Sequence, residues 1–214
     1  MKILFGILIA LSVLSPIVPI LYCIKKRSAF NNQLKALFLY IVVAIVVDVF
    51  SAVFNSFKIN RLPLQLCFDI FELLIISYLY WLQFNNRVLK FTIVSFVGIY
   101  LISIVYFFLT HQNIENIINY ADVIEASIII ILSLIFFFKV LADLEIPKLT
   151  AYPFFWFNSA FLLYFGTSFF LFLFNNNLRS FNETIVLFLN AIHLLMNICF
   201  NTILSIGLCK VKKI

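Results

Sequence analysis

The chain has 214 residues, of which 64% are hydrophobic and 11% are charged, and its mean hydropathy is +1.13. Because a soluble domain carries roughly a quarter charged residues, this composition excludes an ordinary water-soluble fold. The net charge of +6 does not indicate a nucleic-acid partner, since the basic residues gather at the ends of apolar runs, as they do in oriented membrane proteins.

Long apolar stretches recur along the whole chain. Runs such as Ile41–Val47 are continuous, whereas the strands of a membrane barrel alternate between apolar and polar residues, so helices are expected. A span needs about 20 apolar residues, and we predict an all-α polytopic membrane protein, a bundle of seven helices in one domain covering 1–214. In chain order the expected spans are 3–22, 36–54, 64–82, 91–109, 121–138, 154–174 and 184–208.

The first span is expected to be retained and not cleaved as a signal peptide. Only Lys2 precedes its apolar run, and no small-x-small cleavage pattern follows it. Pro16 and Pro19 lie near the end of this span, and proline in a helix interior removes a hydrogen bond and kinks the helix. We therefore expect a kink there.

Charge predicts the orientation. If the first connection lies inside the cell, the inner side holds eleven of the 15 basic residues and the outer side holds four, as the positive-inside rule requires. This places the N-terminus outside and the C-terminus in the cytoplasm. The inner set is Lys25, Lys26, Arg27, Lys35, Arg87, Lys90, Lys139, Lys148, Lys210, Lys212 and Lys213, and the outer set is Lys2, Lys58, Arg61 and Arg179.

Six ionisable residues fall inside the expected spans. Such groups cost roughly 2.5–3.5 kcal/mol each at a helix centre, so they tend to face the interior and to mark function. All six are expected in the outer half of the membrane, above an almost purely apolar inner half, which favours a polar pocket open to the outside. They are Asp48, Asp69, Glu72, Asp122, Glu125 and His193.

Spacing places several of these groups on common helix faces, because residues three or four apart are neighbours on a helix. Asp69 and Glu72 form one such pair and Asp122 and Glu125 another, which is a weak internal repeat. The last span carries a stripe at the same kind of spacing, formed by Asn190, His193, Asn197 and Asn201. Two alternatives stay open: the stripe can simply join helices by hydrogen bonds, and Asp122 can sit in water at a helix start, beside the helix dipole.

Three kinds of chemistry fit these residues. The first is binding of a cationic or amphiphilic ligand, chiefly by Glu72 and His193. The second is a metal site of Glu72, Glu125 and His193, and the third is a relay of protons or coupling ions. The full set of expected ligand-binding residues is Glu72, His193, Glu125, Asp69, Asn190, Asp122, Asp48 and Asn197. We expect no catalytic residue, no cofactor and, in the leading interpretation, no metal.

In topology the chain resembles the seven-span membrane sensor modules of bacterial signalling, which are often fused to histidine kinases or partnered with them. The resemblance rests on the two acidic pairs and on the aromatic start of the sixth span, Tyr152–Trp156. It implies a sensory role. Because the sequence ends at Ile214 without an output domain, the resemblance also implies a separate partner chain.

The leading hypothesis is a non-enzymatic protein of the bacterial inner membrane, sensory or accessory in type, that binds a small or lipid-like ligand or a partner helix in the outer pocket. Its expected partners are membrane lipids and a second protein chain. The abundance of Phe, Ile, Asn and Lys, which AT-rich codons encode, supports a bacterial source. The alternatives are a small transporter or lipid-handling protein, and a structural subunit of a larger membrane complex.

Overall fold

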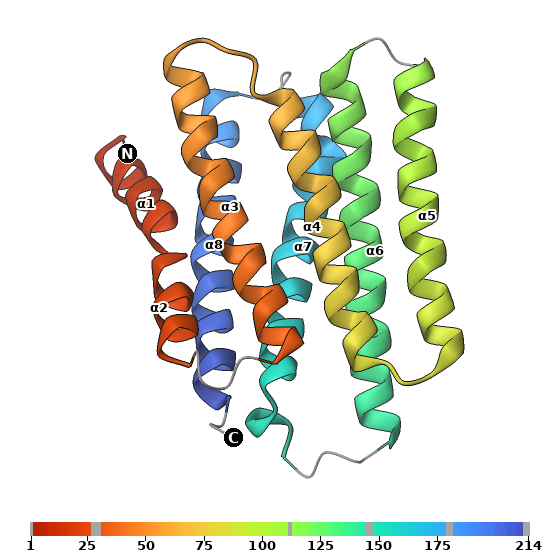
Figure 1. Ribbon diagram of the computed structural model, residues 1–214. Helices are drawn as coiled ribbons and strands as arrows, with labels where there is room; N and C mark the ends of the chain where they lie inside the picture. Colours follow the sequence, from red (N-terminus) through yellow and green to blue (C-terminus); the bar gives the residue numbers. More distant parts are fainter. Residues whose placement is uncertain (1, 27–30, 111–112, 144–147, 179–181, 212–214) are drawn as a thin grey trace. The chain divides into compact units, whose positions relative to one another are not determined.

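The computed structural model describes residues 2–26, 31–110, 113–143, 148–178 and 182–211. Helices make up nearly all of this part of the chain, and no strand occurs in it (Figure 1). The elements are α1 (Lys2–Leu14), α2 (Ile17–Lys25), α3 (Asn32–Ser56), α4 (Leu62–Gln83), α5 (Arg87–Thr110), α6 (Ile114–Asp143), the 3₁₀ turn η2 (Leu149–Ala151), α7 (Pro153–Leu178) and α8 (Glu183–Lys210).

Within these ranges, seven helical stretches are long and apolar enough to cross a membrane, which confirms the predicted all-α architecture and indicates an integral membrane protein. They are Phe5–Lys25, Asn32–Ser56, Leu62–Gln83, Arg87–Thr110, Ile114–Ala142, Pro153–Leu173 and Thr184–Lys210. The direction in which they cross stays a prediction. Four of the basic residues behind it, Arg27, Arg179, Lys212 and Lys213, lie outside the described residues.

The fifth span is longer than its hydropathy indicates. It was expected to begin at Ala121, but α6 begins at Ile114. Backbone hydrogen bonding continues through the polar residues that lower the hydropathy here, and the side chain of Asn113 accepts a bond from the backbone N–H of Glu115 at 3.0 Å. Asp122 is therefore well inside the helix and is not a dipole partner in its first turn, where Glu115 stands instead.

The first span is interrupted as predicted. A turn at Ser15 and Pro16 separates α1 from α2, and the two helices together form the first apolar stretch. Proline cannot donate the backbone hydrogen bond that would continue α1. The backbone N–H of Ser15 still donates to the carbonyl of Leu11 at 2.9 Å, so helical hydrogen bonding continues as far as Ser15.

Asparagine starts several of the helices. Its side-chain oxygen accepts a bond from the backbone N–H two residues further on, which satisfies one of the free donors at a helix start. This contact occurs before or at the start of α4 (Asn60), α5 (Asn86), α6 (Asn113) and α8 (Asn182), at 2.8–3.3 Å. Short polar connections therefore suffice to begin these four helices.

The helices form two compact units, Asn32–Leu132 and a terminal unit of Met1–Asn31 with Ser133–Ile214. In the first unit, α4 packs against both α3 and α5. The rings of Phe107 on α5 and Tyr120 on α6 stack at 4.7 Å. The buried core of this unit includes Leu37, Ile41, Leu73, Ile76, Tyr80, Tyr100, Ala121 and Ile129.

In the terminal unit, α8 packs against α7 and against both α1 and α2 (Figure 1). Ser12 contacts Asn197, Ser15 contacts Asn201, and Lys26 Nζ donates to the Val211 carbonyl at 2.5 Å. Residue numbers rise together along both partners, so the first span and α8 run parallel. The first and last of an odd number of consecutive spans cross a membrane in the same direction, so a parallel pair is required.

Candidate functional site: a buried acidic cluster

The second helix of the Asn32–Leu132 unit supplies two of the carboxylates. Asp69 and Glu72 lie in the first half of α4 and are 6% and 8% exposed. Their spacing of three residues puts both on one face of the helix. That face also carries Leu66, Leu73 and Ile76, so the helix buries its two charges together with its apolar core.

Two more carboxylates come from the first half of α6. Asp122 and Glu125 repeat the same spacing and are 7% and 3% exposed. Small and branched apolar neighbours, Ala121, Ala126 and Ile129, are buried beside them. The repeated Asp-x-x-Glu pattern thus marks two helices of one unit, each presenting its acidic pair to the interior.

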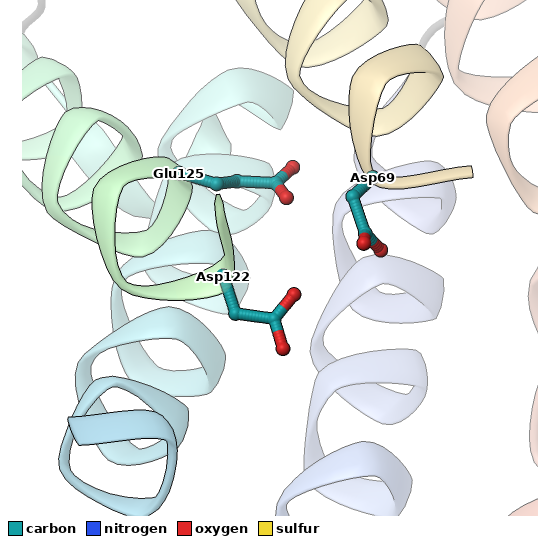
Figure 2. Close-up of side chains that lie close together, drawn as sticks. All are labelled: Asp69, Asp122 and Glu125. Atoms are coloured by element: carbon teal, nitrogen blue, oxygen red, sulfur yellow. The ribbon is translucent and has the colours of Figure 1, made fainter. Parts of the chain in front are cut away.

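The two pairs meet. One carboxylate oxygen each from Asp69, Asp122 and Glu125 lies within 4.8 Å of the others. Figure 2 shows Asp122 and Glu125 reaching from α6 toward Asp69 on α4. Asp69 and Asp122 are close enough for a side-chain hydrogen bond, which two carboxyl groups make only if one of them holds a proton. We call Asp69, Asp122 and Glu125 the acidic cluster.

Glu72 lies next to the acidic cluster and has a partner of its own. The Tyr40 hydroxyl of α3 donates a hydrogen bond to Glu72 Oε1 at 2.6 Å, and both residues are buried. A short bond of this kind joins α3 to α4 in a low-dielectric interior, where it is stronger than in water. The charge of Glu72 also acts on Asp69 and Glu125.

Tyr100 is a member of the site that the sequence analysis did not include. Its side chain is 1% exposed, its hydroxyl has no hydrogen-bond partner, and it is close enough to all four carboxylates to interact with their charges. Its hydroxyl was the available signal, because a buried tyrosine normally needs a partner for that group.

The acidic cluster also keeps unsatisfied oxygens. Asp69 Oδ2 and Glu125 Oε1 are buried without a hydrogen-bond partner. None of the basic residues described in this unit forms an ion pair with the cluster. They lie in the end turns of helices or in connections, and they are Lys35, Lys58, Arg61, Arg87 and Lys90. Buried carboxylates are stable only when they are protonated, paired or bound to a cation. The carboxylates of the acidic cluster must therefore be in one of these three states.

Asp48 stands apart from the other acidic residues. It is exposed on α3, although its charge acts on Glu72. It is not one of the three residues whose carboxylate oxygens lie within 4.8 Å of one another, so it is not a member of the acidic cluster.

The expected polar stripe of α8 lies in the terminal unit, where two of its asparagines make hydrogen bonds to the first span. Asn197 donates to Ser12 Oγ and Asn201 donates to Ser15 Oγ, both at 2.9 Å. His193 packs its ring against Tyr164 at 5.7 Å, and Asn190 is exposed. The predicted grouping of His193 with Glu72 and Glu125 stays a prediction. Among the described residues, the structure brings together the carboxylate oxygens of Asp69, Asp122 and Glu125, which lie within 4.8 Å of one another.

Comparison with protein-family models, with curated proteins and with solved structures found no match for this chain. The resemblance to sensor modules therefore rests on topology and on the residues named above, and the functional argument rests on the acidic cluster.

Proposed function

We propose that this chain is a non-enzymatic membrane protein of sensory or accessory type, which binds a positively charged ligand at the acidic cluster and passes its ligand state to a separate partner chain. The observation that supports the proposal most is the charge balance of the site. Four carboxylates are buried within one unit, and no basic side chain described in that unit pairs with them.

A structural role explains the cluster less well. A helix contact needs polar groups that satisfy one another, as in the pairs Ser12–Asn197 and Ser15–Asn201. The acidic cluster instead brings like charges together and leaves two oxygens and one hydroxyl without partners. A bound cation would stabilise such a group of carboxylates. Without a cation, the group destabilises the folded chain.

The position of the cluster suits a sensor. Asp69 is on α4 and Asp122 and Glu125 are on α6, so one ligand would join two helices that are separated in sequence by α5. Binding would then stabilise the arrangement in which the two helices are close, and a ligand shifts an equilibrium by its differential affinity for the two states. A partner chain that contacts either helix could respond to that shift.

The proposal is tested with the full chain purified in mild detergent. Its thermal stability is measured against a panel of positively charged compounds: divalent metal ions, monovalent ions and organic amines. We expect at least one to raise the melting temperature of the wild type, because ligands that bind only the folded state stabilise it. The shift should disappear in Asp122→Asn combined with Glu125→Gln and persist in Glu115→Gln. No shift with any member of the panel would contradict the proposal.

A further inference from the structure

We infer that Asp69, Asp122 and Glu125 form a binding site for a bare divalent cation of calcium size, with the Tyr100 hydroxyl as its neutral partner. The inference rests on the proposed function and specifies the ligand.

The spacing of the oxygens suits calcium. Ca²⁺ binds oxygen at about 2.3–2.6 Å, so two oxygens of one shell are at most about 5.2 Å apart. The three carboxylate oxygens lie within 4.8 Å of one another, and they fit that shell as they stand. Mg²⁺ demands a near-ideal octahedron and usually keeps several of its waters, which suits a site of three residues at most 7% exposed less well.

The donor atoms are of one kind. The acidic cluster offers only carboxylate oxygens, and the further groups that interact with it, the Glu72 carboxylate and the Tyr100 hydroxyl, also present oxygen. Oxygen ligands suit calcium, magnesium and manganese, whereas zinc and copper sites are usually built with imidazole or thiolate. None of the four free cysteines, Cys23, Cys67, Cys199 and Cys209, belongs to the cluster.

The unsatisfied groups point to a missing ligand independently of the charges. The Tyr100 hydroxyl comes from α5, a different helix from those that carry the carboxylates, and it is 1% exposed without a hydrogen-bond partner among the described residues. Glu125 Oε1 is also unpartnered. A cation that orders the carboxylates would let this hydroxyl donate to a ligating oxygen, an outer contact that typically tunes metal affinity.

Burial favours a bare ion over an organic cation. Each residue of the acidic cluster is at most 7% exposed, and the cluster lies on spans that are long enough to cross a membrane. An organic ammonium brings carbon substituents that need an opening of their own. A divalent ion needs only the volume between the oxygens, and it offsets two of the three negative charges.

The test uses the full chain in mild detergent and radioactive calcium in equilibrium dialysis. We expect about one Ca²⁺ per chain, and we expect Asp122→Asn to weaken binding about tenfold or more, since each carboxylate contributes ligand charge. Glu115→Gln removes the same charge two turns earlier on α6 and should leave the affinity unchanged. Equal binding by Asp122→Asn and wild type would place any calcium elsewhere and overturn the inference.

A second pair of variants covers the case in which Asp122→Asn does not fold. Tyr100→Phe keeps every carboxylate and should weaken calcium binding about tenfold, as loss of an outer-shell partner does, while the melting temperature in chelator stays at the wild-type value. Tyr106→Phe, an exposed position on the same helix, is its control. Unchanged affinity in Tyr100→Phe overturns the assigned role of Tyr100 and, where Asp122→Asn is unfolded, the inference as a whole.

The outcomes separate this inference from the proposed function. If the wild type binds no divalent ion but an organic amine or a monovalent ion stabilises it through the same carboxylates, the divalent site is wrong and the proposed function stands. If no cation binds at all, both are wrong.

Discussion

At the scale of single residues, the carboxylates of the Asn32–Leu132 unit differ in how they are satisfied. Glu72 has a short hydrogen bond from Tyr40 at 2.6 Å, whereas Asp69 and Glu125 each keep a buried oxygen without a partner. This difference divides the site into a structural contact between α3 and α4 and a group that needs a ligand. The two acidic pairs look alike in sequence, and only their surroundings distinguish Glu72 from the rest.

Replacing Tyr40 by Phe should lower the free energy of unfolding by about 1–3 kcal/mol, because it leaves the buried Glu72 carboxyl without its donor. Unfolding in mixed detergent, followed by circular dichroism, measures the change. Tyr78→Phe, on the exposed side of α4, is the matched control and should be neutral. Equal stabilities of the two variants would show that the Tyr40 contact contributes nothing.

At the scale of helices, α7 and α8 approach each other closely at Gly207. A Cβ atom at this position would lie 2.5 Å from Phe157 Cε1 and 3.0 Å from Trp156 Cβ. Small residues allow backbones in membranes to approach closely. Nearer the start of α8, Asn197 and Asn201 bond to Ser12 and Ser15 of the first span.

Gly207→Ala should therefore destabilise the chain by about 1–3 kcal/mol, the usual cost of overpacking a core. The loss should shrink when Phe157→Leu removes part of the clashing ring. Gly166→Ala on α7 meets nothing within 4 Å and should be neutral or slightly stabilising, since alanine is the better helix former. A melting temperature of Gly207→Ala equal to that of the wild type would contradict the close packing.

At the scale of the whole molecule, the described residues hold seven candidate spans, the first and last of which run parallel. We therefore predict that the two ends of the chain lie on opposite sides of the membrane. Which end lies outside depends on the distribution of basic residues, eleven on one side and four on the other. Because Lys and Arg are retained on the cytoplasmic side, we predict that the N-terminus is outside.

Single cysteines test this orientation in a background in which Cys23, Cys67, Cys199 and Cys209 are replaced by serine or alanine. A membrane-impermeant maleimide added to intact cells should label Lys58→Cys, in the α3–α4 connection. It should label Lys148→Cys, before α7, only after the membrane is permeabilised. The reverse pattern would invert the predicted orientation, and labelling of both positions in intact cells would contradict an odd number of crossings between them.

Sequence alone determined the seven candidate spans, the all-helical class and the interruption at Pro16, because these depend on local hydropathy and on backbone chemistry that is the same in any context. It also singled out Asp69, Glu72, Asp122 and Glu125, since a charge inside an apolar run is costly wherever the helix packs. The start of α6 could not be predicted from hydropathy. Hydropathy drops at polar residues such as Glu115, whereas helical hydrogen bonding continues through them.

Only the tertiary structure decided which of these groups meet. The contact of Asp69 with Asp122 and Glu125, the bond from Tyr40 to Glu72 and the place of Tyr100 all depend on how α3, α4, α5 and α6 face one another. The same holds for Asn197 and Asn201, whose partners on the first span lie far away in sequence. Helix periodicity states which residues share a face, but the partner of that face is set by packing between distant segments.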